Sequence, residues 1–145
     1  ENEYKQFFPL YEYATFGFRT KIGYLYNFSS NSQQIGDLPF YDRLYLGGST
    51  SLRGWGEGDL DSFGGYLKQL LNLEVRIPLF WILGLNLFFD TGKLINENTN
   101  QNNEFNWNIG YGITAMSPIG PLRIDFAYQY GYGKPYVTNG LLFIF

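Results

Sequence analysis

Apolar and polar side chains alternate along several long stretches of the chain. Residues 13–28 place Phe16, Phe18 and Ile22 on one face and Arg19 and Lys21 on the other. A period of two predicts a β-strand with one apolar and one polar face, and this stretch is longer than a typical strand of a soluble sheet. The same pattern predicts further strands over residues 65–79, 83–92, 105–116, 122–130 and 140–145, and the tail of a strand over residues 4–10.

Charged residues in these predicted strands lie on the face opposite the apolar one. They are Arg19, Lys21, Lys68, Glu74, Arg76, Asp90, Arg123 and Asp125. Long loops are predicted at residues 29–64, 93–104 and 131–139, and they alternate with short turns near Pro9, at 78–82 and at 117–121. Long loops at one end, short turns at the other and an apolar outer face are what a transmembrane β-barrel requires. We therefore expect an all-β, antiparallel portion of such a barrel, and a soluble β-sandwich stays open as the alternative because its strands also alternate.

The predicted strands are too few to close a barrel. About six or seven are predicted from the sequence, whereas bacterial barrels have at least eight strands and an even number of them. An open sheet would leave unpaired backbone groups in the hydrocarbon region of the membrane, which is not tolerated. The chain is therefore expected either to be the C-terminal part of a larger barrel or to pair with another chain.

Composition narrows the functions that remain. Aromatic residues make up 21% of the 145 residues, and there are 18 Gly but no Cys and no His. The absence of Cys and His removes disulfides, thiol and imidazole chemistry and the commonest metal ligands, so we expect no metal, no cofactor and no catalysis by these groups. A net charge of −3 without a basic cluster gives no support for nucleic-acid binding. No run of apolar residues is long enough for a transmembrane helix.

The long connection at residues 29–64 carries an unusual sequence. An aromatic and aliphatic string at residues 38–46 leads into residues 47–55, a segment rich in glycine and hydroxyl groups with one arginine, Arg53. A disordered linker would not carry so many aromatic residues, and structureless loops of this length are usually functional when they are ordered. The alternation pattern also places Glu74 and Asp90 on the polar face of the two strands predicted after this loop.

Four motifs in sequence order resemble the Omp85 superfamily of outer-membrane proteins. The first motif is Leu38-Pro39-Phe40-Tyr41 with residues 46–55, which resembles the sixth extracellular loop of the family. The second, Asn72-Leu73-Glu74 through Pro78, resembles the strand after this loop, and the third, Phe89-Asp90-Thr91-Gly92, resembles a further strand. The fourth, residues 116–123, resembles the turn before the last two strands. The terminal Phe145 also resembles the C-terminal aromatic signal of bacterial outer-membrane proteins. The likeness covers roughly residues 13–145.

The resemblance implies a fold, a function and a set of site residues. Members of the family are sixteen-stranded barrels with periplasmic POTRA domains, and they insert proteins into outer membranes or translocate proteins across them. Their sixth loop folds back into the barrel lumen, where its arginine pairs with carboxylates of the following strands. Carried over to this chain, the loop motif is Leu52, Arg53, Gly54 and Trp55, its carboxylate partners are Glu74 and Asp90, and the C-terminal signal and seam comprise Leu141, Phe143 and Phe145.

The resemblance also implies partners and a location. The expected partners are outer-membrane lipids, unfolded outer-membrane or secreted proteins as substrates, accessory assembly lipoproteins, and the N-terminal remainder of the barrel with its POTRA domains. The expected location is the bacterial outer membrane, with the plastid outer envelope as the alternative. Two other transport functions remain open from the sequence: a secretion transporter of the same family that exports a passenger such as a patatin-like lipase, and a passive porin.

Overall fold

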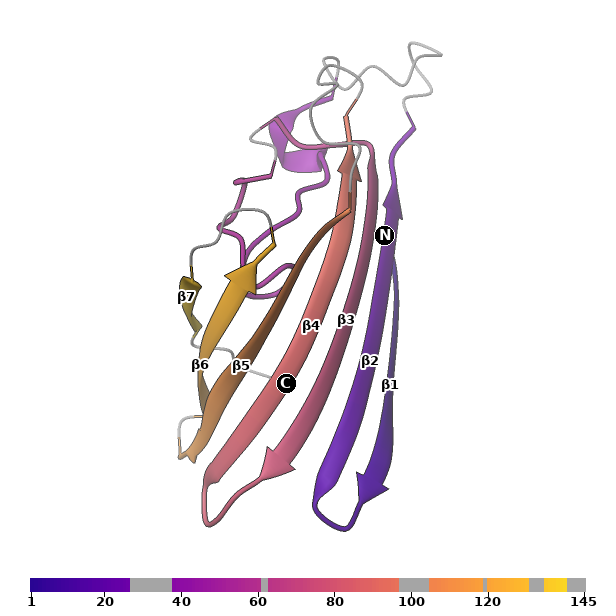
Figure 1. The fold of residues 1–145 in the computed structure, drawn as a ribbon. Coiled ribbons are helices and arrows are strands. Elements are labelled where there is room, and N and C mark those ends of the chain that lie inside the picture. Colours follow the sequence, from indigo (N-terminus) through magenta and orange to yellow (C-terminus); the bar gives the residue numbers. More distant parts are fainter. Residues whose placement is uncertain (27–37, 61–62, 97–104, 119, 131–134, 141–145) are drawn as a thin grey trace.

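A computed structural model describes residues 1–26, 38–60, 63–96, 105–118, 120–130 and 135–140 of the chain. The described strands form one antiparallel sheet in which each strand is paired with its neighbours in chain order (Figure 1). They are β1 (Asn2–Tyr11), β2 (Ala14–Tyr24), β3 (Leu67–Pro78), β4 (Leu83–Ile95), β5 (Asn106–Ser117), β6 (Gly120–Gln129) and β7 (Pro135–Gly140). A short 3-10 helix, η2 (Phe40–Asp42), lies in the connection between β2 and β3. The predicted all-β, antiparallel class is confirmed.

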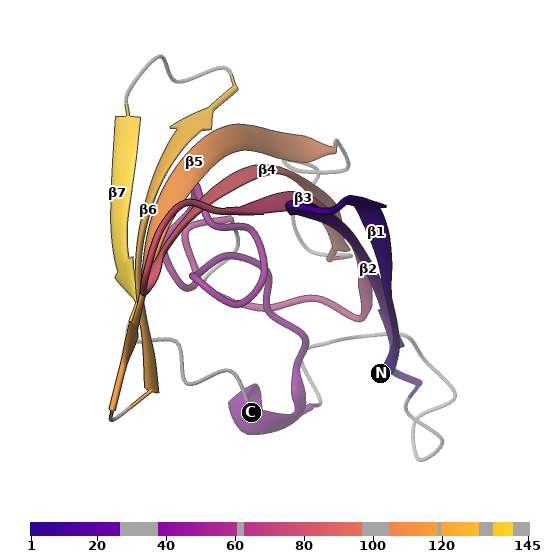
Figure 2. The same ribbon diagram turned by 90° about the horizontal axis from the view of Figure 1, so that it is seen from below.

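The register of the strands keeps the two faces of the sheet chemically distinct. Asn72 of β3 pairs with Asp90 of β4, whereas Leu73 pairs with Phe89 on the opposite face. Directly paired residues of antiparallel strands lie on the same face, so this register places Asn72 beside Asp90 on one face and Leu73 beside Phe89 on the other. The sheet is curved, and residues 38–60, which we call the inner loop, lie on its concave side (Figure 2).

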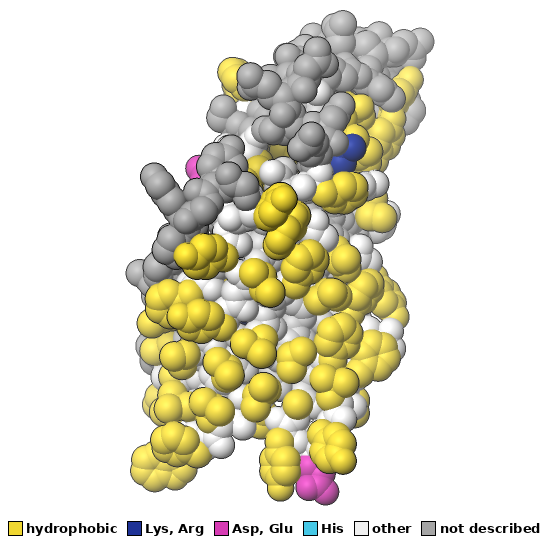
Figure 3. Space-filling view, in the orientation of Figure 1, with side chains coloured by type: hydrophobic (Ala, Val, Ile, Leu, Met, Phe, Trp, Pro, Cys, Tyr) yellow, Lys and Arg dark blue, Asp and Glu magenta, His cyan; other side chains and the backbone are white. Residues whose placement is uncertain are grey.

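The opposite, convex face of the sheet is apolar and exposed. Figure 3 shows hydrophobic side chains spread over the sheet, with few charged side chains among them. The exposed large hydrophobic residues of the central strands include Leu87, Ile109, Tyr111, Ile113, Ile124 and Tyr128. An apolar surface of this extent marks a contact with a membrane or another protein rather than with water.

Two predicted strands are placed differently in the structure. β1 is a complete strand of 10 residues instead of a tail, and its turn to β2 follows Tyr11 instead of Pro9. Pro9 lies at a register irregularity between Pro9 and Tyr11, and such bulges are positions where a strand tolerates proline. β4 continues to Ile95, three residues beyond the predicted end at Gly92, because Leu94 packs against the inner loop.

The last described strand also differs from the prediction. β7 pairs with residues 123–128 of β6, although its first five residues were predicted as part of the loop 131–139. Gly140 lies in the strand predicted at residues 140–145, and pairing with β6 extends this strand back to Pro135. Residues 141–145, which complete the predicted final strand and include Leu141, Phe143 and Phe145, lie outside the described residues.

The buried apolar core lies between the sheet and the inner loop. It consists of Leu44, Leu46, Leu52, Trp55 and Leu60 from the loop, with Leu70 of β3 and Leu94 of β4. In the described part of the chain the strands belong to a single sheet, so the loop occupies the side where a β-sandwich would place its second sheet. Among the same residues, no helix is long and apolar enough to cross a membrane.

Candidate functional site

The tip of the inner loop is closed by its own backbone. Gly48 N donates to the carbonyl of Trp55 (2.7 Å), Ser51 N donates to the carbonyl of Gly48 (3.1 Å), and Trp55 N donates to that of Leu52 (3.0 Å). Gly47 has a φ of 118°, and a Cβ there would collide with the carbonyl oxygen of Gly56. Glycine is therefore required at this turn, which presents the segment between Gly48 and Trp55 to the sheet.

Arg53, at the centre of this tip, is buried and bonded to two carboxylates of the concave face. Its Nε and Nη2 donate to the two oxygens of Asp90, at 2.8 and 2.7 Å, and its Nη1 donates to Glu74 Oε2 at 2.5 Å. The Arg53–Asp90 pair is thus bidentate, an arrangement that lysine cannot reproduce. Burial by itself lowers the pKa of Arg53, but hydrogen bonds and charges from Asp90 and Glu74 outweigh it and hold the pKa above its ordinary value.

Asp90 is fully buried and accepts hydrogen bonds from four donor groups. In addition to the Arg53 guanidinium, its oxygens accept from Arg53 N (3.2 Å), Asn72 Nδ2 (2.7 Å) and Asn108 Nδ2 (3.1 Å). Arg53 provides the cationic partner in this set, because the two asparagines are neutral. The charge of Asp90 is therefore compensated by the inner loop.

Glu74 differs from Asp90 because further arginines of the sheet also bind it. Arg123 donates to both of its oxygens, at 3.1 and 3.0 Å, and Arg76 Nε donates to Oε1 at 2.7 Å. Arg123 also donates to Asp125 Oδ1 at 2.7 Å. Since Arg123 lies on β6 and Glu74 on β3, this pair connects strands that are separated by β4 and β5 in the sheet. We call it the cross-sheet pair.

Small residues and an aromatic ring complete the arginine site. The Arg53 guanidinium carbon lies 3.7 Å from the centre of the Phe88 ring, a cation–π contact. A Cβ on Gly110 would come 2.5 Å from this ring, so glycine at that position leaves room for Phe88. A Cβ on Gly54 would come 2.8 Å from the Cβ of Asn108, so Gly54 allows the loop to approach β5 closely.

Side chains of three strands also hold the backbone of the loop tip. Arg19 of β2 donates to the carbonyl of Thr50 at 2.7 Å, and Asn72 of β3 donates to that of Ser51 at 2.7 Å. Gln129 of β6 donates to the carbonyl of Gly54. The tip is therefore bound across most of the width of the sheet, through groups that do not depend on the identity of the loop side chains.

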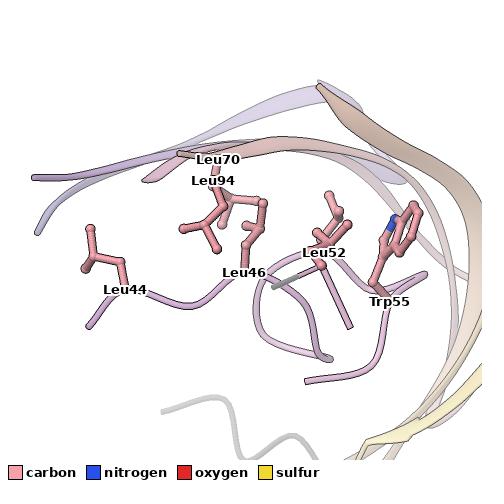
Figure 4. Packing of buried hydrophobic residues seen from close by; sticks show 7 residues of the cluster. Leu44, Leu46, Leu52, Trp55, Leu70 and Leu94 are labelled. Carbon is pink, nitrogen blue, oxygen red and sulfur yellow. The ribbon is translucent and has the colours of Figure 1, made fainter. Parts of the chain in front are cut away.

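An apolar contact lies next to the arginine site. Figure 4 shows Leu46 of the loop beneath Leu70 and Leu94 of the sheet, with Leu44 on one side and Leu52 followed by Trp55 on the other. Leu46 and Leu52 are almost completely buried. These contacts come from Leu70 and Leu94, which together with Phe88 are the buried hydrophobic residues of β3 and β4 on the concave face.

The structure brings together most of the residues that the sequence singled out. Arg53, Glu74 and Asp90 are in direct contact, and Gly54 lies against Asn108. Leu52 and Trp55 lie in the apolar core beside them. Leu141, Phe143 and Phe145 are outside the described residues. Among the residues that the structure describes, no group of three or more His, Cys, Asp or Glu side chains is arranged to hold a metal ion.

Sequence reasoning missed three parts of the site. It assigned Arg123 only to the polar face, and it did not predict that Leu70 and Leu94 contact the loop. The signal for Leu70 was present, since this leucine stands between Lys68 and Asn72 on the polar face. No sequence signal indicates the cross-sheet pair of Arg123 and Glu74, because it depends on the curvature of the sheet.

A curved antiparallel sheet with an apolar convex face and a charged, loop-filled concave face is a section of a transmembrane β-barrel. Comparison with known families identifies which barrel. Residues 1–139 match the Omp85 superfamily domain, so the chain belongs to the Omp85 superfamily. The curved sheet is therefore part of the wall of such a barrel, and the inner loop lies on the concave side of this wall.

Individual relatives agree with this assignment. The chain is 32% identical over 119 residues to the outer membrane protein assembly factor BamA of Nitratidesulfovibrio vulgaris, a match covering 68% of this chain and 14% of the relative. It is 31% identical over 102 residues to the chloroplastic outer envelope protein 39 of Arabidopsis thaliana, covering 64% of this chain and 28% of the relative. The chain thus spans less than a third of the length of these relatives.

A solved structure shows the same fold. The crystal structure of BamA from Haemophilus ducreyi lacking POTRA domains 1–3 superimposes with a TM-score of 0.74 at 20% identity, over 94% of this chain and 32% of that one. The names of the sequence relatives refer to the bacterial outer membrane and to the chloroplast outer envelope. Membership of the family therefore places the chain in an outer membrane.

Proposed function

We propose that the chain is the C-terminal portion of an Omp85 barrel that inserts or translocates proteins at the outer membrane, with the inner loop as a plug in the barrel lumen. The names of two BamA relatives support assembly of outer-membrane proteins as the activity. The observation that carries the plug role is Arg53, buried and bonded to Asp90 and Glu74 on the lumen side. No catalytic step is part of this function.

The anchoring role of Arg53 rests on the energetics of a buried ion pair. Removing one partner of such a pair leaves an uncompensated charge and costs about 3–5 kcal/mol. If Arg53 is removed while the loop stays docked, Asp90 remains buried without a cationic partner and bears that penalty. Arg53 is therefore expected to fix the docked position of the loop in the lumen.

The proposed partners follow from the two faces of the sheet. The apolar convex face contacts the lipids of the outer membrane, and the free edges of the sheet pair with the N-terminal remainder of the barrel. POTRA domains precede that barrel. Unfolded outer-membrane or secreted proteins are the proposed substrates, and accessory lipoproteins are the proposed assembly partners.

The test compares Arg53→Ala with Arg43→Ala in the full-length protein reconstituted into liposomes. Both variants remove one positive charge from the same connection, but Arg43 donates to the carbonyls of Leu38 and Phe63 and not to Asp90 or Glu74. We expect Arg53→Ala to slow insertion of an unfolded outer-membrane protein and to raise single-channel conductance, and Arg43→Ala to change neither strongly.

The two readouts separate the two parts of the proposal. Unchanged conductance and unchanged heat-modifiable mobility on gels in Arg53→Ala would show that Arg53 does not anchor a plug. If the unmodified protein inserts no substrate and instead exports a dedicated passenger, the assembly function is wrong even where the plug is real.

A further inference from the structure

The turn between β3 and β4 is apolar throughout and exposed. It consists of Leu79, Phe80, Trp81 and Ile82, and the side chain of Trp81 is 97% exposed. The turn is closed by hydrogen bonds from Leu79 N to the carbonyl of Leu83 (2.9 Å) and from Leu83 N to that of Phe80 (3.0 Å). Turns that face water normally contain glycine, asparagine, aspartate or serine, and this one contains none of them.

Trp81 is held at the tip of this turn by an unfavourable backbone conformation. Its φ is 57°, in the left-handed region that glycine and asparagine adopt easily and a bulky residue rarely adopts. Among the residues that the structure describes, Trp81 is the only non-glycine residue with a positive φ. A backbone outlier of this kind costs of order 1–3 kcal/mol, and glycine at residue 81 would avoid that cost. The indole at this position therefore has a function other than forming the turn.

Neighbouring parts of the sheet carry exposed aromatic residues at the same end. Tyr11 and Tyr13 flank the turn between β1 and β2, and both are exposed. Met116 of β5 is also exposed, and its N–H donates to the carbonyl of Ile82 at 2.8 Å. We call Tyr11, Tyr13, Phe80 and Trp81 the aromatic rim. It is continuous with the apolar convex face, whose hydrophobic side chains extend to the lower end of the sheet in Figure 3.

We propose that the whole β3–β4 turn is immersed in the interfacial region of the leaflet on the short-turn side, with Trp81 as its anchor. Tryptophan and tyrosine are enriched at membrane–water interfaces because one part of the ring is apolar and the other is polar. Lipid is favoured over a protein partner because the turn continues the exposed apolar face of the sheet and contains no charged residue. The turn itself, and not only the ends of the strands, is thus a membrane contact.

Immersion of the turn has a geometric consequence for this part of the barrel. In an ordinary outer-membrane barrel the short turns connect strands beyond the apolar band. The turn between β1 and β2 fits that description because it contains Glu12, a charged residue next to Tyr11 and Tyr13. The β3–β4 hairpin therefore ends within the leaflet, whereas the β1–β2 hairpin reaches water.

Three tryptophans in different environments provide the experiment with internal controls. The full-length protein is reconstituted into liposomes of phospholipids with bromine atoms on the acyl chains, either close to the head group or close to the chain end. The fluorescence of Trp81 is obtained as the difference between the unmodified protein and Trp81→Phe. Trp55→Phe reports a buried indole of the lumen loop, and Trp107→Phe reports a convex-face indole that stacks on Tyr130 at 4.3 Å.

We expect bromine close to the head group to quench the Trp81 component by a larger factor than bromine close to the chain end, and aqueous acrylamide to quench it weakly. The Trp107 component should also be quenched by bromine, and the Trp55 component should not. Heat-modifiable mobility of each variant checks that the barrel is folded.

Two outcomes would overturn the proposal. Strong quenching of Trp81 by acrylamide without quenching by bromine would place the turn in water. Protection of Trp81 from both quenchers would show that a protein surface, such as a periplasmic domain, covers the turn. None of these readouts depends on substrate insertion, so the result is independent of the proposed function.

Discussion

The inner loop is attached to the sheet in two ways that differ in their physics. The polar attachment joins Arg53 to Asp90 and Glu74, and the apolar attachment packs Leu46 and Leu52 of the loop against two leucines of the sheet. Both attachments use the same two strands, since Glu74 and Leu70 lie on β3 and Asp90 and Leu94 lie on β4. They are adjacent along the lumen wall and nevertheless supply different kinds of stabilisation.

The two attachments determine different properties of the docked loop, namely its affinity for the sheet and the position of its tip. Apolar packing is non-directional and proportional to the area removed from water, so Leu70 and Leu94 would hold the loop in more than one register. A bidentate arginine pair has a fixed geometry but repays little of the desolvation of its charges. We infer that the apolar attachment supplies most of the net affinity, and that the polar attachment determines where the loop tip sits.

Removal of Asp90 should cause the largest loss of folding free energy. Asp90→Ala leaves Arg53 with Glu74 and with Asp125 at 4.0 Å, and it removes a carboxylate that accepts from Asn72 and Asn108. This should cost about 3–5 kcal/mol of folding free energy. The measurement is the urea unfolding midpoint of the full-length protein in lipid. Glu57→Ala, an exposed acidic residue of the same loop, is the control and should change the midpoint little. Equal midpoints for both variants would mean that the polar attachment is energetically minor.

Truncation of the apolar attachment should cause the second-largest loss of folding free energy. Leu94→Ala creates a cavity between the loop and β4 and should cost about 2–5 kcal/mol. Leu87→Ala removes the same atoms from the same strand on the exposed convex face and serves as the matched control. The double variant Asp90→Ala/Leu94→Ala then tests whether the attachments are coupled. Interaction energies of about 0.5–3 kcal/mol are typical of residues that act as one unit, and strict additivity would indicate two independent contacts.

The smallest of the three effects should come from Gly54→Ala. A Cβ at this position meets Asn108 at 2.8 Å, so the loop tip must move away from β5, at a cost of about 1–3 kcal/mol. The expected readout is faster proteolytic cleavage of the inner loop. Gly84→Ala is the control, because its Cβ makes an ordinary contact of 3.6 Å with the carbonyl oxygen of Ile77. Equal cleavage rates in both variants would contradict close packing at Gly54.

The strands and their faces could be predicted because side chains alternate with a period of two whenever one face is apolar. Glu74 and Asp90 were assigned to the lumen side for this reason. The start of the last strand is predicted five residues too late, at Gly140 instead of Pro135, because pairing with β6 rather than the local sequence determines where β7 begins.

The apolar attachment and the cross-sheet pair could not be predicted for a different reason. Leu70 and Leu94 are apolar residues at positions of the predicted polar face. The alternation pattern identifies such residues but does not indicate which part of the chain they contact. The contact between Arg123 and Glu74 joins strands that are not neighbours, so it requires the curvature of the whole sheet, which no local sequence signal encodes.

The position of both attachments on a single hairpin has a consequence for the order of folding. β3 and β4 are consecutive in the chain and directly paired, and the inner loop immediately precedes them. Hairpins form within about 1–10 μs, well before distant strands can pair. The loop can therefore dock on its hairpin while the sheet is still open, and the barrel closes around a loop that is already in place. No bulky segment has to be threaded through the mouth of a finished cylinder.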